Sequence, residues 1–316
     1  MCAESHAFRP DSAENLCISP GDARQDVRRD RVSGGRQINC LATGRAAVTV
    51  TAQPRAAGHV RLSAGPGPRG SAIARLRQSG AFKALFPRPR DGALDAILVN
   101  TAGGITGGDR FEADIQAEPG SHLRVTTQAA ERAYRAQPGE RGRVTNRLGV
   151  APGARLDWLP QETILYDGAA LDRRLVADLA PDARLLLVEP LVFGRAAMGE
   201  VLRAVSFRDR IEIRRAGAPL YLDALRFEGD LAAHLARPAV ASGAGAMASV
   251  ILVAPEAEAH LAPLRALMPA TGGVSLIGAD LLALRLLAPD SFALRRVLVP
   301  VLGRLTDGSL PRSWMT

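Results

Sequence analysis

The residues in this sequence best suited to chemistry are acids that interrupt or follow apolar runs. They are Asp109, Glu131, Glu162, Glu189, Glu200 and Asp223. Glu189 lies inside LLLVEPLVF, and an unpaired charge buried in such a run would be strongly destabilising. Each acid must therefore pair with a cation, hold a proton, or face a water-filled passage. A salt bridge to a nearby arginine, such as Arg110, Arg132 or Arg195, is the ordinary alternative for any one of them.

Other common site chemistries lack their motifs. The five histidines show no close metal-binding spacing; they are His6, His59, His122, His234 and His260. The cysteines are Cys2, Cys17 and Cys40, all before the part that we expect to fold, so no thiolate site or disulfide framework is indicated there. A G-x-S-x-G nucleophile elbow is absent. Paired carboxylates for acid–base work stay open as an alternative.

The stretch from Ile97 to Phe111, ILVNTAGGITGGDRF, is the most distinctive segment of the chain. A short apolar strand leads into a turn with glycines at Gly103, Gly104, Gly107 and Gly108, and Asp109 follows at once. The turn has no lysine for a phosphate-binding loop and does not fit the G-x-G-x-x-G spacing of a dinucleotide site. A tight turn with a bulge between strands is the structural alternative.

Composition narrows the function further. The chain has 316 residues, enough for one large domain or two smaller ones, and a formal charge of +8. Its only lysine is Lys83, and the arginines are spread along the chain without interleaved aromatics, which favours an acidic protein partner over nucleic acid. No apolar run is long enough to span a bilayer, and the N-terminus has no signal pattern, so we expect a cytoplasmic protein without a membrane partner.

The periodicity predicts a mainly β protein. Residues 1–45 are polar and are expected to form a disordered extension, whereas 46–316 form a β-rich domain that opens with a strand at Ala46–Ala52. Strands are predicted at His122–Gln128, Arg143–Val150, Arg155–Leu159, Leu171–Leu179 and Ile211–Arg214. Beyond Leu231 the period changes to that of helices at Glu256–Met268 and Asp290–Leu305, with Asp290 or Ser291 as N-cap and with kinks or shortening at Pro263 and Pro300. A strand at Leu281–Leu287 separates them.

A weak internal repeat accompanies these strands. AEPGSHL, VAPGARL and LAPDARL place a Pro-Gly or Pro-Asp turn before successive strands, with prolines at 119, 152 and 181. The interval indicates strand pairs stacked in layers, and an antiparallel sandwich that reuses one corner is the alternative. We therefore expect stacked or sandwiched antiparallel strands, with about two helices packed on the C-terminal flank.

Five motifs stand out in order along the chain: NTAGGITGGD (Asn100–Asp109), TTQAAERAYR (Thr126–Arg135), LDWLPQETILYDGA (Leu156–Ala169), EPLVFGRAAMGE (Glu189–Glu200) and LPRSWMT (Leu310–Thr316). Together they resemble the UreD (UreH) family of urease accessory proteins. The resemblance covers about Ala72 to Thr316 and leaves out the N-terminal extension. It implies a β-rich scaffold, not an enzyme, that binds apo-urease and works with UreF and the GTPase UreG, with nickel brought by UreE.

The resemblance also implies a role for the acids. Carboxylate and water ligands hold nickel weakly enough to release it, so transient nickel passage is expected and no stably bound cofactor. Our hypothesis is that Asp109, Glu189 and Asp223 line a hydrated path through the β domain, with Glu131 near it. Two other classes stay open: a β-scaffold hydrolase or transferase of unknown substrate, and a basic nucleic-acid-binding module.

Overall fold

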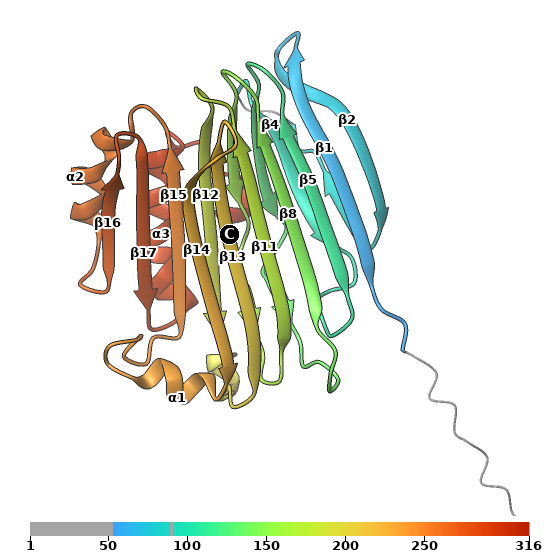
Figure 1. The fold of residues 1–316 in the computed structure, drawn as a ribbon, viewed down its shortest axis with the longest axis vertical. Helices are drawn as coiled ribbons and strands as arrows, with labels where there is room; N and C mark the ends of the chain where they lie inside the picture. Colours follow the sequence, from blue (N-terminus) through green and yellow to red (C-terminus); the bar gives the residue numbers. More distant parts are fainter. Residues whose placement is uncertain (1–52, 89–90, 316) are drawn as a thin grey trace, which may run out of the picture. The chain divides into compact units, whose positions relative to one another are not determined.

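A computed structural model describes residues 53–88 and 91–315. The predicted extension (1–45) and the predicted strand at 46–52 lie outside these residues. Residues Ala52–Thr316 form one compact unit by their internal contacts. This unit is mainly β, as predicted, and consists of two large sheets with helices near the C-terminus (Figure 1).

Sheet A contains seven strands in the order β14-β13-β11-β8-β5-β1-β2. Their bounds are β1 (Ala57–Gly67), β2 (Gly70–Gly80), β5 (Arg110–Ala117), β8 (Gly142–Val150), β11 (Ala170–Leu179), β13 (Val205–Arg215) and β14 (Ala218–Gly229).

Sheet B has the order β16-β17-β15-β12-β9-β6-β4-β3, and two short strands, β7 and β10, attach to it through β12. The bounds are β3 (Phe82–Leu85), β4 (Leu94–Asn100), β6 (His122–Thr127), β7 (Glu131–Ala133), β9 (Arg155–Leu159), β10 (Thr163–Leu165), β12 (Arg184–Phe193), β15 (Ala246–Val253), β16 (Gly272–Ile277) and β17 (Leu281–Ala288). All five strands predicted between 122 and 214 are present, as is the strand predicted at Leu281–Leu287.

Between β4 and β13 the long strands alternate between the two sheets, so the chain winds as a flattened coil. Each proline turn carries the chain from sheet A to sheet B, and the three copies stack in register. In sheet A Val150 pairs with both Ala117 and Leu179, and in sheet B Arg155 pairs with both His122 and Arg184. The interpretation of the repeat as stacked layers is therefore confirmed.

The expected antiparallel pairing is wrong for the centre of both sheets. β1, β5, β8, β11 and β13 run parallel in sheet A, and β4, β6, β9 and β12 run parallel in sheet B. Antiparallel pairs occur toward the edges, for example β1 with β2 and β13 with β14. A short turn can precede a parallel strand here because it transfers the chain to the other sheet, and the intervening strand there serves as the crossover.

Two apolar cores hold the unit together. One fills the space between the sheets and includes Val60, Leu123 and Phe207, all without measurable exposure. The other lies on the opposite face of sheet B, where Leu186, Val250 and their neighbours pack against α2 (Ala257–Leu267) and α3 (Ser291–Leu305). Figure 1 shows both helices beside β15–β17. Strand β12 is therefore covered on both faces, which accounts for its nearly uninterrupted apolar sequence.

The two C-terminal helices match the prediction closely. Asp290 caps α3 by accepting a hydrogen bond from the Ala293 N–H at 2.8 Å. Both helices continue through their prolines, Pro263 and Pro300, so the expected shortening does not occur. A third helix, α1 (Leu231–Ala236), and two single 3₁₀ turns, η1 (Ala196–Met198) and η2 (Arg312–Trp314), complete the elements. Within the described residues, no helix combines the length and apolar character needed to cross a membrane.

Candidate functional site

A cavity of about 260 Å³ lies between the two sheets. Its outer end is formed by the glycine turn and the segment after β6, where Gly103, Gln128 and Arg132 are exposed. Its inner end reaches Trp158 and Glu189, which are 3% and 7% exposed. The cavity therefore extends from the surface to a buried carboxylate.

Glu131 lies near the mouth of this cavity, on β7. Its carboxylate accepts a hydrogen bond from Asn100 Nδ2 at 3.1 Å and one from the Arg132 N–H at 3.1 Å. Burial raises the pKa of Glu131 although these hydrogen bonds oppose the shift, and the nearby Asp109 charge raises it further. The described residues form no salt bridge with Glu131, and because burial destabilises its ionised form, a cation placed beside it would supply the missing counter-charge.

At the inner end, Glu189 belongs to a buried charge cluster that joins the two sheets. Arg173 on β11 contacts Glu189 on β12 at 2.9 Å and also pairs with Asp209 on β13. Trp158 Nε1 donates a second hydrogen bond to Glu189 at 2.9 Å. Burial raises the pKa of Glu189, although Arg173 opposes the shift. With both acids ionised the cluster carries one uncompensated negative charge, so a proton or a cation is favoured there.

A second, much smaller cavity of about 10 Å³ lies behind Glu189, with room for about one water molecule. Glu189, Asp209, Asp223 and Ser249 contribute to its wall. Asp223, on β14, also forms an ion pair with Arg285 of β17. Glu189 borders both cavities, whereas Glu131 borders only the larger cavity and Asp223 only the smaller one.

The larger cavity also has an unused polar group in its wall. Gln161 is 6% exposed, and its Oε1 accepts a hydrogen bond from Arg295 Nη1 at 2.8 Å. Its Nε2 has no protein partner in the described part of the chain. Because buried amides are nearly always satisfied, water in the cavity is the natural acceptor. The lining therefore favours a hydrated interior.

The remaining predicted acids have local structural partners. Asp109 lies outside both cavity walls, and its carboxylate accepts hydrogen bonds from the backbone N–H groups of Ala56 and Thr106, each at 2.8 Å. Asp109 thus closes the glycine turn. Glu162 contacts Arg295 of α3 at 3.0 Å, and Glu200 contacts Arg195 at 2.9 Å. The salt-bridge alternative therefore describes Glu162 and Glu200, and arginines also pair with Glu189 and Asp223.

The glycine turn is shaped by close approaches. Gly103 and Gly108 have φ angles of +78° and +86°, which other residues adopt only with strain. Gly104 lies under the ring of Tyr134, and a Cβ at this position would be 2.2 Å from Tyr134 Cε2. The interpretation as a tight, packed turn is thus supported, and the turn forms part of the cavity mouth.

Sequence reasoning missed Arg173 and Asp209, although the pattern contained them. On β11, Leu171, Arg173 and Leu175 share one face, and the leucines are buried between the sheets. On β13, Phe207, Asp209 and Ile211 do the same. Alternation alone therefore places both charges inside.

Among the described residues, no three His, Cys, Asp or Glu side chains are grouped closely enough to hold a metal ion together.

This geometry defines a class of protein: a β-rich scaffold with an internal, partly acidic cavity that opens at one surface. Comparison with known proteins identifies the family. A family model described as UreD urease accessory protein matches residues 56–315. The chain belongs to the UreD family of urease accessory proteins, so it is an accessory protein and not a catalytic enzyme, and its role lies in urease maturation.

Individual relatives agree with this assignment. The chain is 58% identical to a urease accessory protein UreD of Ruegeria pomeroyi, over 77% of this chain and 95% of the relative. It is 55% identical to that of Roseobacter denitrificans, over 83% and 96% of the two chains. A Methylobacterium relative is 45% identical over 83% and 95%.

Proposed function

We propose that this protein is a scaffold and nickel conduit in urease maturation, binding apo-urease and the UreF–UreG complex, with nickel brought by UreE. The observation that carries the proposal is the pair of internal cavities that share Glu189, with Glu131 in the wall of the larger and Asp223 in the wall of the smaller. Nickel is the cargo, held only in passing. Asp109 contributes indirectly, by holding the glycine turn that forms part of the mouth.

The chemistry of the wall is consistent with transit. Among the described residues no three acids are grouped closely enough to hold a metal ion, so an incoming ion would be held by few carboxylates together with water. Such sites bind a divalent ion weakly and release it, whereas a set of thiolates or imidazoles would retain it. The free amide of Gln161 supports the presence of water, which would keep the ion partly hydrated along its way.

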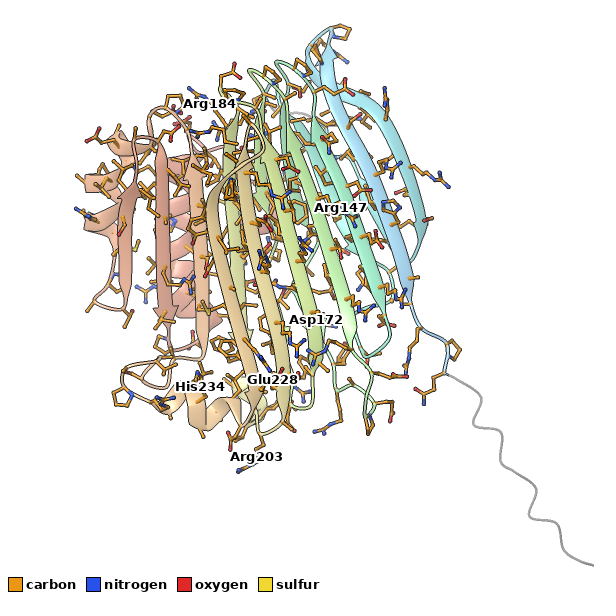
Figure 2. The ribbon with its side chains drawn as sticks, viewed as in Figure 1. Arg147, Asp172, Arg184, Arg203, Glu228 and His234 are labelled. Carbon is orange, nitrogen blue, oxygen red and sulfur yellow. The ribbon has the colours of Figure 1, made fainter. Side chains whose placement is uncertain are left out.

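Partner binding is proposed from family membership and from the surplus of basic residues. The formal charge of +8 favours association with acidic protein surfaces. Many arginines on the outer face of sheet A are already paired with acids. Arg147, which is labelled in Figure 2, contacts Glu112 and Asp114. The unpaired positive charge that could attract an acidic partner must therefore lie elsewhere on the surface.

The test is urease activation in cells that co-express the urease subunits and the other accessory proteins. Glu131→Gln and Glu189→Gln remove the charge but keep the shape of each side chain. We expect both variants to bind their partners normally while the nickel content and urea hydrolysis of urease fall about tenfold or more. Glu112→Gln, on the outer face of sheet A, is the matched control and should activate normally. Full activation by both cavity variants would reject the conduit.

A further inference from the structure

Beside the cavity mouth is a rigid surface of aromatic and arginine side chains. The rings of Tyr134 and Tyr166 meet edge to face, with centroids 5.0 Å apart. The guanidinium of Arg195 lies 4.3 Å from the centre of the Tyr166 ring and is held by Glu200 at 2.9 and 3.0 Å. Side chains fixed in this way lose little entropy when a partner binds.

The glycine turn holds Tyr134 in place. Because Gly104 has no Cβ, the ring packs directly on the turn, and the Tyr134 hydroxyl donates a hydrogen bond to the Gly103 carbonyl at 3.2 Å. Tyr134 is nevertheless 36% exposed. The turn thus presents an aromatic ring to solvent instead of burying it.

Exposed apolar side chains lie on the chain segment that supplies Arg195. Met198 on η1 is 73% exposed, and Val201 is 46% exposed. Both lie on the segment between β12 and β13, the same segment that supplies Arg195. Tyrosine, arginine and methionine are the residue types enriched in protein–protein interfaces, and tyrosine and arginine are frequent hot spots.

The charge of this surface is positive. The surface carries four arginines and two carboxylates, namely Arg132, Arg135, Arg195 and Arg203 with Asp167 and Glu200. The two carboxylates already contact Arg135 and Arg195, respectively. The Asp167 carboxylate also accepts hydrogen bonds from the backbone N–H groups of Arg203 and Ala204, at 2.8 and 2.9 Å. The side chain of Arg203 extends outward at the lower edge of the unit (Figure 2). Even when Glu131 inside the mouth is counted, positive charge is in excess, so a complementary partner must be acidic.

We propose that the surface formed by Tyr134, Tyr166, Arg195, Met198, Val201 and Arg203 docks an acidic face of a partner protein, which then covers the mouth of the cavity. Tyr134 of this surface donates a hydrogen bond to the carbonyl of Gly103, and Gly103 lines the cavity together with Glu131, so the docked partner would lie at the mouth. Docking depends only on these surface residues, whereas the transfer of nickel from the docked partner into the cavity rests on the proposed function.

The experiment measures binding of the full chain to two purified probes in separate arms, the cognate UreF–UreG complex and apo-urease. Met198→Glu and Arg203→Glu alter exposed side chains and should leave folding intact. We expect each to weaken binding to one probe about tenfold or more, and the wild-type affinity for that probe to fall as salt rises. Phe292→Glu, at a residue 71% exposed on α3, is the matched control and should bind both probes normally.

Unchanged affinity for both probes in the two variants would overturn the docking surface. That failure is distinct from failure of the conduit, which is read from the nickel content of urease with Glu131→Gln. A chain that binds both probes normally after Met198→Glu, yet still fails to activate urease after Glu131→Gln, would reject the surface and keep the conduit.

Discussion

The buried cluster of Arg173, Glu189 and Asp209 allows a quantitative prediction about stability. Replacing Arg173 by methionine keeps most of the side-chain volume but leaves two carboxylates, each 7% exposed, without their shared cation. Breaking a buried ion pair by removing one partner costs about 3–5 kcal/mol. Because a domain of this kind has roughly 5–15 kcal/mol of stability in total, Arg173→Met should lower the denaturation midpoint severely.

Glu189→Gln should behave very differently. Arg173 keeps its pair with Asp209, and the glutamine amide oxygen can still accept the hydrogen bond from Trp158. The substitution also removes the uncompensated negative charge. We therefore expect a cost of about 1 kcal/mol or less. The triple variant Arg173→Met, Glu189→Gln, Asp209→Asn should recover at least about 2 kcal/mol of the loss caused by Arg173→Met alone, since the three side chains are coupled.

Urea denaturation followed by tryptophan fluorescence measures these differences, because Trp158 contacts the cluster directly. Arg147→Met on the outer face of sheet A is the control, and it should change the free energy of unfolding by about 0.5 kcal/mol or less. Equal midpoints for Arg173→Met and Glu189→Gln would refute the reasoning. In that case the two acids would not depend on Arg173, and the cluster would not be a coupled unit.

Two further predictions concern the mouth of the cavity. Burial raises the pKa of Glu131 above 4.5, so the folded protein holds this proton more tightly than the unfolded chain does. The free energy of unfolding should therefore fall as the pH rises from 4.5 through the raised pKa. Urea denaturation at several pH values measures this, and the free energy of unfolding should depend less steeply on pH in Glu131→Gln. Gly104→Ala would push the ring of Tyr134 off the glycine turn and should weaken partner binding about tenfold. Gly103→Ala is the control: its Cβ would meet nothing within 4 Å, so this variant should lose some stability but bind normally. Equal binding by the two variants would count against the packed turn.

Much of the fold could be predicted from local pattern. Alternation located β6, β8, β9, β11 and part of β13, but not the central strands β5 and β12. The proline turns at 119, 152 and 181 indicated the layers that the coil forms. The direction of pairing could not be read in the same way, since alternation is identical in parallel and antiparallel strands with one buried face. The three-residue strands β7 and β10 were also missed, because so few residues carry no period.

The site was harder to predict than the fold. The sequence drew attention to Asp109 because it follows the glycines, but its carboxylate is used by backbone N–H groups. Glu189 and Asp223 do border a common cavity, yet their partners Arg173 and Arg285 lie on strands of the opposite sheet. Which arginine meets which acid depends on the register between strands and on the stacking of the two sheets, and local pattern does not specify either one.

Because the chain winds as a coil, the space between the two sheets can become longer or shorter along one direction, that in which the strands are stacked. Every turn of the coil adds one strand to each sheet, and adjacent strands lie about 4.8 Å apart. Duplicating or deleting a whole turn would therefore lengthen or shorten the space between the sheets in steps of that size and leave both ends intact. If the proposed conduit runs between the sheets, the distance that the ion covers would change by the spacing of one strand with each added turn.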